Sequence, residues 1–181
     1  MFALNPNSRH TPYPASLKSI LAIDAAEESR AWLATWSRIN MQGTPLRSLP
    51  DLARRLGLAG VSIKDESVRS PLGSFKPLGA PIALVRLILR RFPDSGYTAT
   101  GLFGRRHRDT LSDFTVISAT DGNHGKALAA AAQSIGCRCV IVIHGQVSEE
   151  RERAIAEFGA EVIRIAGNYD ESVEEAARLA A

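Results

Sequence analysis

A lysine in a turn-rich stretch is the first candidate for chemistry. Residues 70–77 read Ser-Pro-Leu-Gly-Ser-Phe-Lys-Pro, which places Lys76 directly before Pro77. Proline fits the first turn of a helix, because the N–H that it lacks would have no partner there. A lysine at a helix start meets the positive end of the helix dipole, and partial burial also disfavours its charge. The neutral amine that results is the form that builds a Schiff base with an aldehyde. The alternative is an ordinary solvated lysine.

A second polar turn follows further along the chain. Residues 118–125 read Ser-Ala-Thr-Asp-Gly-Asn-His-Gly, between an apolar, β-rich run at 114–118 and an alanine-rich helical run. The glycines permit close approach of the backbone to a ligand. The N–H groups at the start of the helix favour an anionic or acceptor oxygen. The alternative is an ordinary helix cap made by Asp121 or Asn123.

The C-terminal part of the sequence alternates regularly between strand and helix patterns. We expect a parallel sheet with helices on both faces and right-handed crossovers, which is an α/β fold. Ligands bind at the carboxyl ends of such strands, where the Asp121 turn lies. His144 also follows a strand end, but we assign it no role. The predicted strands are 114–118, 138–143 and 161–165, and the predicted helices are 123–135, 148–158 and 169–180.

The N-terminal part is less regular. We expect an extended arm over residues 1–23, because prolines occur there without periodicity. Asp24 is expected to cap a helix from Ala25 to Arg38, with Trp32 and Trp36 on one face as core or interface anchors. The other elements expected before residue 93 are a helix at 51–56 that starts after Pro50 and ends at Gly57, a strand at 61–65 and a helix at 77–92, whose first turn Pro81 could shift.

Residues 93–113 form the least regular stretch. They contain the basic run Arg105-Arg106-His107-Arg108. A phosphate or nucleic-acid patch is one interpretation of such a run. A solvated loop is the interpretation that we favour, because no aromatic residues alternate with these charges.

Composition excludes some classes of function. The 181 residues are 45% hydrophobic and 23% charged, as in globular proteins, and the net charge of +3 does not call for nucleic acid or a membrane. Cys137 and Cys139 are expected to be reduced thiols, which suits the cytoplasm, and such a pair makes no zinc site by itself, so we expect no metal. No signal-peptide pattern occurs at Met1–Asn5, and no apolar run is long enough to span a bilayer.

The two polar turns together resemble the fold-type II family of pyridoxal-phosphate enzymes, whose fold is that of the tryptophan synthase β chain. Ser74-Phe75-Lys76 matches the family's Ser-x-Lys segment, whose lysine carries the cofactor as a Schiff base. The stretch 122–125, Gly-Asn-His-Gly, matches the turn whose asparagine lies against the 3′-oxygen of the cofactor ring. The resemblance implies that pyridoxal 5′-phosphate is bound by Lys76 and Asn123, with Ser74, Gly122 and His124 beside it.

Asp121 narrows the resemblance. Most relatives, such as the serine and threonine dehydratases, carry serine at this position, whereas an Asp-Gly-Asn-His-Gly turn is similar to that of the diaminopropionate ammonia-lyases. Gly-Thr-Pro-Leu at 43–46 and Lys-Asp-Glu-Ser at 64–67 also fit. The resemblance implies conversion of 2,3-diaminopropionate to pyruvate and ammonia, with Lys76 and Asp121 as the bases for opposite enantiomers. A carboxylate at position 121 would also attract the second ammonium of that substrate.

The sequence departs from the family in one large respect. The glycine-rich loop for the cofactor phosphate and the residue that contacts the pyridine nitrogen are both absent. We therefore expect the chain to be the N-terminal part of a longer enzyme and to be inactive alone. Residues 1–75 are assigned to the larger cofactor domain, whose remainder is missing, and residues 76–181 to a smaller βαβαβα domain. Relatives are commonly homodimers, and the resemblance implies the same here.

Two other interpretations remain open. One is a serine or threonine dehydratase, against which Asp121 in place of serine argues. The other is a non-catalytic α/β module that binds a small ligand or associates with itself. Retention of both Lys76 and Asp121 favours an enzyme, because a binding module needs neither.

Overall fold

The chain is described here by a computed structural model that covers residues 5–8, 11–19 and 21–181. Met1–Leu4, which belong to the stretch predicted to carry no signal peptide, lie outside the described residues. The described part of the predicted N-terminal arm is exposed and contains one 3₁₀ turn, Ala15–Leu17. Within the described ranges, no helix combines the length and the apolar character needed to cross a membrane.

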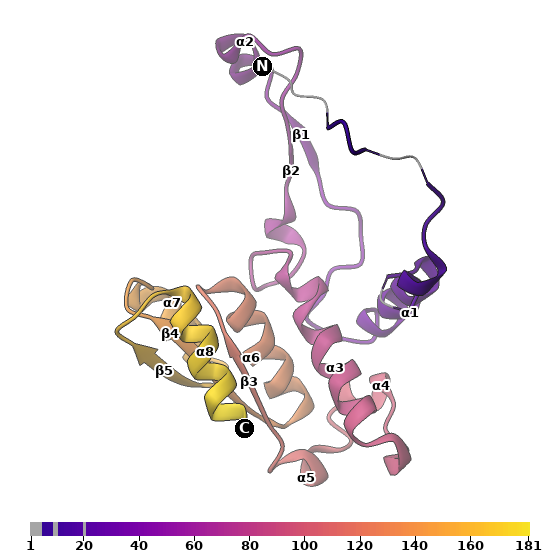
Figure 1. Cartoon of the computed structure of the whole chain (residues 1–181), viewed down its shortest axis with the longest axis vertical. Coiled ribbons are helices and arrows are strands. Elements are labelled where there is room, and N and C mark those ends of the chain that lie inside the picture. Colours follow the sequence, from indigo (N-terminus) through magenta and orange to yellow (C-terminus); the bar gives the residue numbers. More distant parts are fainter. Residues whose placement is uncertain (1–4, 9–10, 20) are drawn as a thin grey trace.

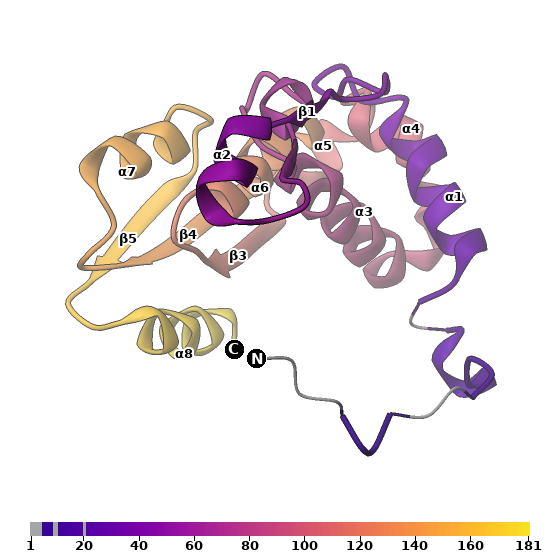
Figure 2. The same ribbon diagram turned by 90° about the horizontal axis from the view of Figure 1, so that it is seen from above.

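A parallel three-stranded sheet forms the C-terminal half of the molecule. Its strands are β3 (Thr115–Ala119), β4 (Arg138–His144) and β5 (Glu161–Ile165), in the order β3-β4-β5. Its helices are α6 (Asn123–Ile135), α7 (Glu149–Ala156) and α8 (Tyr169–Ala180). Figure 2 shows α8 on one side of the strands and α6 and α7 on the other. The predicted α/β fold is thus confirmed, and each of these six elements lies within two residues of its predicted bounds.

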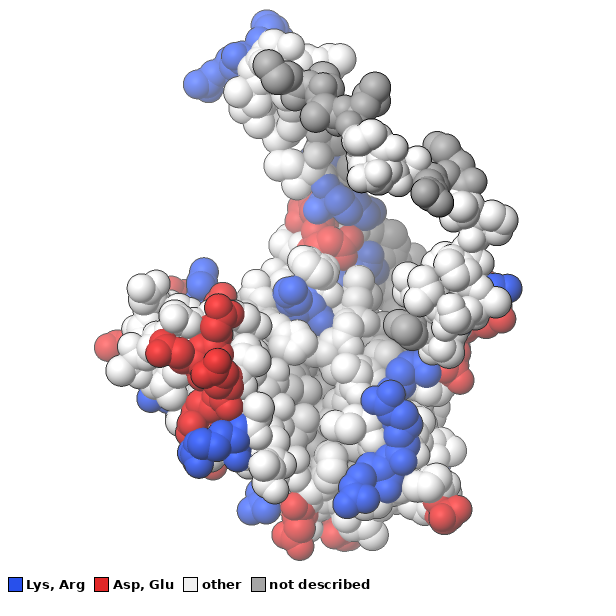
Figure 3. Space-filling model, in the orientation of Figure 1, with Lys and Arg blue, Asp and Glu red and all other residues white. Residues whose placement is uncertain are grey.

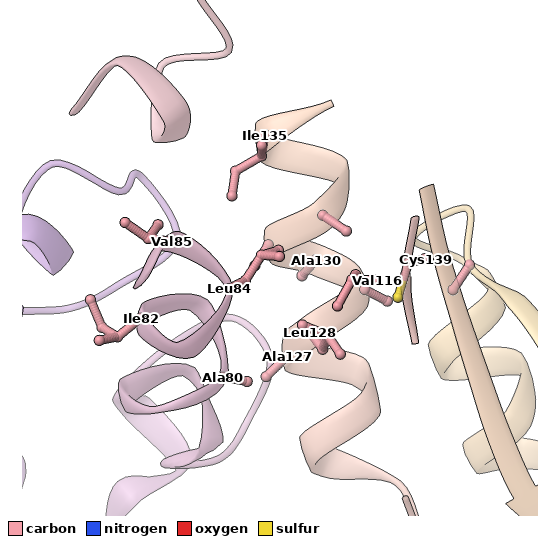
Figure 4. Close-up of a cluster of buried hydrophobic side chains, with 14 of the residues drawn as sticks. Ala80, Ile82, Leu84, Val85, Val116, Ala127, Leu128, Ala130, Ile135 and Cys139 are labelled. Atoms are coloured by element: carbon pink, nitrogen blue, oxygen red, sulfur yellow. The ribbon is translucent and has the colours of Figure 1, made fainter. Parts of the chain in front are cut away.

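The core lies between this sheet and the helix α3 (Ala80–Arg91), as Figures 1 and 4 show. Helix α6 is sandwiched between them, and its alanines 127 and 129–132 are fully buried. Small side chains let α6 approach both neighbours closely, while larger residues of α3 such as Leu84, Val85 and Ile88 fill the space that remains. Helix α6 is therefore fixed at both sides, and so is the turn that precedes it.

The first helix differs from its prediction. Helix α1 runs from Ile23 to Leu33, so that Asp24 lies inside the first turn and does not cap it. Trp36 follows the helix instead of belonging to it. Its side chain is buried, its ring stacks on Phe103 with the centroids 5.6 Å apart, and its indole N–H donates to Ser134 Oγ at 3.0 Å. The prediction of Trp36 as a core anchor is confirmed, although the predicted helix was too long.

A β-hairpin with an inserted helix projects from the body of the molecule in Figure 1. Strands β1 (Leu46–Ser48) and β2 (Ser62–Lys64) pair antiparallel, and helix α2 (Pro50–Leu56) connects them. Gly57 ends α2 with φ 65°, as predicted. Strand β1 was not predicted.

The stretch 93–113 is not simply a solvated loop, and that prediction was wrong in part. It contains a 3₁₀ turn (Pro93–Ser95) and helices α4 (Ala99–Phe103) and α5 (Arg108–Leu111). Leu102, Phe103 and Leu111 are buried in the core. The three arginines of the basic run are exposed, as expected. On the face shown in Figure 3, acidic side chains gather along α8, and basic ones form separate clusters.

Candidate active site

A cleft of about 490 Å³ lies at the carboxyl end of β3, the edge that the topology predicts for a ligand site. Its volume is in the range of small-molecule sites. It brings the two predicted loops together, since both contribute lining residues. The cleft is lined by Lys76, Ser118, Ala119, Thr120, Asp121, Gly122, Asn123, His124, Arg151 and Tyr169.

Lys76 reaches the cleft from a short 3₁₀ turn, Lys76–Leu78. The α-helix α3 begins only at Ala80, with Pro81 in its first turn. Lys76 is therefore not at the start of an α-helix, and the predicted effect of a helix dipole on its amine does not apply. The side chain is half-buried, and its Nζ lies 4.8 Å from the centre of the Phe75 ring. The aromatic face and the partial burial hold the amine at the mouth of the cleft.

Thr120 takes the place of a capping side chain for helix α6, whose N-cap residue is Gly122. Its side chain is buried, and its Oγ1 accepts hydrogen bonds from the backbone N–H groups of Gly122 and Gly125, each at 3.1 Å. The alternative that Asp121 or Asn123 is the cap is therefore wrong. Both side chains line the cleft instead.

Two glycines let the turn approach its neighbours. Gly122 has φ 150°, a conformation that side chains disfavour, and a Cβ there would lie 3.2 Å from Arg151 Cδ. A Cβ on Gly125 would lie 2.4 Å from Thr120 Cγ2, far inside contact distance. Only glycine fits at position 125 while the first turn of α6 packs this closely against Thr120.

The carboxylate of Asp121 is fixed at the rim of the cleft. Its Oδ1 lies 2.9 Å from His144 Nε2, and its backbone oxygen accepts a hydrogen bond from Arg151 at 3.3 Å. The Asp121 side chain is 58% exposed, whereas that of His144 is 13% exposed. His144 is the last residue of β4. No role was predicted for His144, because its proximity to Asp121 depends on the register of two strands.

His124 and Lys76 come from the two loops and line the same cleft. Burial lowers the pKa of its half-buried imidazole, and the positive charge of Lys76 lowers that pKa further. Such an electrostatic effect requires proximity between the two side chains. His124 is thus favoured in its neutral form next to the lysine.

Ser74 is the one predicted site residue that does not line the cleft. Its Oγ accepts a hydrogen bond from the backbone N–H of Lys76 at 3.4 Å. Ser74 therefore shapes the turn that carries the lysine.

Similarity to known proteins identifies the enzyme family of this chain. The sequence pattern of the family described as pyridoxal-phosphate dependent enzyme matches residues 38–181. The chain belongs to this family, which confirms the family and the cofactor that the sequence predicted. The diaminopropionate ammonia-lyase of Salmonella typhimurium is 34% identical over 143 residues, which are 78% of this chain and 35% of that protein. The biosynthetic L-threonine dehydratase of Pasteurella multocida is 30% identical over 174 residues, or 96% of this chain and 28% of that protein.

Solved structures of a diaminopropionate ammonia-lyase are also similar to this chain. The apo crystal structure of Escherichia coli diaminopropionate ammonia-lyase has a TM-score of 0.73 at 31% identity, covering 88% of this chain and 42% of that one. The same enzyme in complex with an aminoacrylate–PLP azomethine intermediate has a TM-score of 0.70 at 32% identity, covering 88% and 39%. The chain spans about a third of the length of the curated relatives that it matches.

The residues of the cleft suit one end of pyridoxal phosphate. The cofactor carries an aldehyde, next to it a 3′-oxygen, and further away a phosphate. The cleft offers the Lys76 amine for the aldehyde, and the Asn123 amide at the start of α6 for an acceptor oxygen. The donor set therefore fits the reactive end of the cofactor.

Proposed function

We propose that the protein to which this chain belongs is a pyridoxal-phosphate-dependent ammonia-lyase that converts 2,3-diaminopropionate to pyruvate and ammonia. The observation that carries the proposal is the position of Asp121. Its carboxylate lines the same cleft as Lys76, is mostly exposed, and contacts His144 at 2.9 Å rather than capping a helix. A carboxylate in the cleft would attract the second ammonium group of this substrate.

The chain's residues have distinct roles in this proposal. Lys76 would hold the cofactor through its amine, Asn123 would donate to the 3′-oxygen, and Gly122 and His124 would form the adjoining wall. Ser74 positions the lysine turn through its hydrogen bond to the Lys76 N–H. When bound, pyridoxal phosphate withdraws electrons from the substrate's α-carbon, which makes the α-proton acidic and allows a group to leave from the β-carbon.

In this proposal, each enantiomer of the substrate has its own base. The Lys76 amine, free once the substrate's amine has replaced it on the cofactor, would take the α-proton of one enantiomer, and the Asp121 carboxylate would take that of the other. Asp121 also attracts the second ammonium of the substrate, which distinguishes diaminopropionate from serine or threonine. The β-amino group would leave as ammonia, and the α-amino group would be released as a second ammonia by hydrolysis, with water supplying the keto oxygen of pyruvate.

The principal alternative is a serine or threonine dehydratase. The similarity to the threonine dehydratase of Pasteurella multocida, over 96% of this chain, favours it. Asp121 argues against this alternative, because the family resemblance implies a serine at this position in the dehydratases. A non-catalytic α/β module is disfavoured by the joint presence of Lys76 and Asp121 in one cleft.

The remaining assignments are part of the same proposal. The full-length protein is a cytoplasmic homodimer, and residues 1–75 and 76–181 belong to its larger and smaller domains. One buried cluster includes Leu33 and Leu72 from the first segment and α6 from the second. Limited proteolysis of the full-length protein tests this boundary: first cleavage near residue 75 would support it, whereas protection there would show that the shared cluster unites the two segments.

The test of the function uses the full-length holoenzyme and both enantiomers of 2,3-diaminopropionate. We expect Asp121→Asn to lower kcat/KM for the D-isomer by about 10²- to 10⁴-fold, the usual contribution of a general base. The L-isomer should lose less, because it loses only the attraction of its second ammonium to Asp121, while Lys76 still takes its α-proton. Equal loss for both isomers would remove the two-base assignment, and a wild-type preference for serine or threonine would favour the dehydratase.

A further inference from the structure

Asp121 and His144 are neighbours because of the strand register. Ala119 of β3 lies opposite Val142 of β4 in the parallel pair. Asp121 and His144 each follow two residues later, at the carboxyl ends of these strands. The sheet therefore places the two side chains next to each other, with Asp121 Oδ1 at 2.9 Å from His144 Nε2.

The hydrogen bonds of the imidazole define its tautomer. The backbone N–H of Gln146 donates to His144 Nδ1 at 3.3 Å. A nitrogen that accepts a hydrogen bond carries no proton, so the proton of the neutral ring lies on Nε2. Nε2–H then donates to the Asp121 carboxylate. The hydrogen bond at Nδ1 thus determines that Nε2 is the nitrogen that donates.

The turn that carries Gln146 is itself held in place. Arg164 of β5 donates from NH1 to the backbone oxygens of Gly145 at 3.1 Å and Val147 at 2.8 Å. Its Nε also donates to Glu152 of α7 at 3.1 Å. A fixed turn gives Gln146 a fixed N–H, and hence the imidazole a fixed orientation.

We propose that His144 is a positioning residue, which donates from Nε2 to the Asp121 carboxylate and aims it into the cleft as the base for one enantiomer. This assignment rests on the proposed function of Asp121. His144 does not itself line the cleft, and its imidazole is linked to the cleft through the Asp121 carboxylate, so we expect it to act through Asp121. Its loss should therefore affect the D-isomer and spare the L-isomer, which a merely structural residue would not do.

The test compares substitutions at position 144 in the full-length holoenzyme. We expect His144→Leu to lower kcat/KM for the D-isomer by about 10- to 100-fold, the equivalent of one hydrogen bond to a charged group. The L-isomer should stay within about twofold, a smaller effect than loss of that bond. Glutamine can place an amide N–H near the position of Nε2, whereas asparagine is too short. His144→Gln should therefore retain most activity and His144→Asn should not, and this polar pair decides the question if the leucine variant does not fold.

A double variant separates positioning from other effects. In the background of Asp121→Asn, His144→Asn should cause no further loss for the D-isomer, because the two residues act as one unit. Additive losses, or equal losses for both isomers, would overturn the assignment. If Asp121→Asn is selective for the D-isomer and His144→Asn has no effect, only the role of His144 fails. If Asp121→Asn shows no selectivity, the two-base function fails, and the role of His144 fails with it.

A spectroscopic readout is independent of turnover. The ¹⁵N chemical shifts of the His144 ring in the apo full-length protein should be those of the Nε2–H tautomer at neutral pH, with the signal assigned by its absence in His144→Gln. The Nδ1–H tautomer would contradict the proposed hydrogen bond.

Discussion

The hydroxyl of Thr120 accepts a hydrogen bond from the backbone N–H of Gly125 at 3.1 Å. The same oxygen accepts a second bond from the N–H of Gly122. Thr120 thereby satisfies the N–H of Gly125 in the first turn of α6 and that of Gly122, the residue before the helix. Asp121 and Asn123 are left to face the cleft.

The cap can be tested by substitution. Thr120→Val removes the buried hydroxyl and leaves two N–H groups without their acceptor, so we expect the free energy of unfolding to fall by about 2 kcal/mol. Urea unfolding of the full-length protein measures this change. Thr120→Ser keeps the hydroxyl and serves as the control. An unchanged unfolding midpoint for the valine variant would show that another group caps α6.

The contact at Gly125 predicts a steric effect. In Gly125→Ala the new Cβ would lie 2.4 Å from Thr120 Cγ2 and 3.1 Å from Ile141 Cγ2, so that α6 must move. We expect a loss of stability of about 1–3 kcal/mol. Gly60→Ala is the matched control, because no atom lies within 4 Å of a Cβ at that position. Equal stabilities of the two variants would contradict the close packing of α6 against this turn.

The environment of His124 predicts a dependence on pH. Because the pKa of His124 is lowered in the fold, the unfolded chain binds this proton at a higher pH than the folded chain. The free energy of unfolding should therefore fall as the pH drops below 6.5, the ordinary pKa of histidine. Lys76→Met removes the nearby positive charge and should raise the pKa of His124, while burial still keeps it below the ordinary value.

An NMR titration of the His124 ring in the apo full-length protein measures that shift. Lys64→Met is the control, because Lys64 lies in β2 and is not among the causes of the His124 shift. An unchanged pKa in Lys76→Met would mean that the two loops are further apart than described.

The sequence predicted the βαβαβα half of the fold closely. Apolar strand runs there alternate with amphipathic helices, and glycines such as Gly136 and Gly159 separate them, so that local pattern and tertiary structure agree. The prediction failed where tertiary contacts decide. Trp36 lies beyond its helix because Phe103 and Ser134 hold it, and neither contact is visible in local periodicity. Strand β1 has three exposed residues, too few to show an alternating pattern.

The candidate site was predictable only in part. Motifs identified Lys76 and the Asp121 turn, because their residue types and turn chemistry are local. The pairing of Asp121 with His144 depends on the register between β3 and β4, which the sequence alone does not give. The cap by Thr120 was also missed, because the usual capping preference pointed to the aspartate or asparagine that follows it.

The central claim is that Lys76 carries the cofactor in the cleft beside Asp121. The direct test is borohydride reduction of the full-length protein with pyridoxal phosphate, followed by peptide mapping by mass spectrometry. We predict a phosphopyridoxyl group on Lys76, and its loss in Lys76→Ala. Lys126 is the internal comparison, since its Nζ donates to Leu72 O at 3.4 Å in the chain segment that leads to Lys76. Labelling of Lys126 or another lysine, with Lys76 unmodified, would contradict the account.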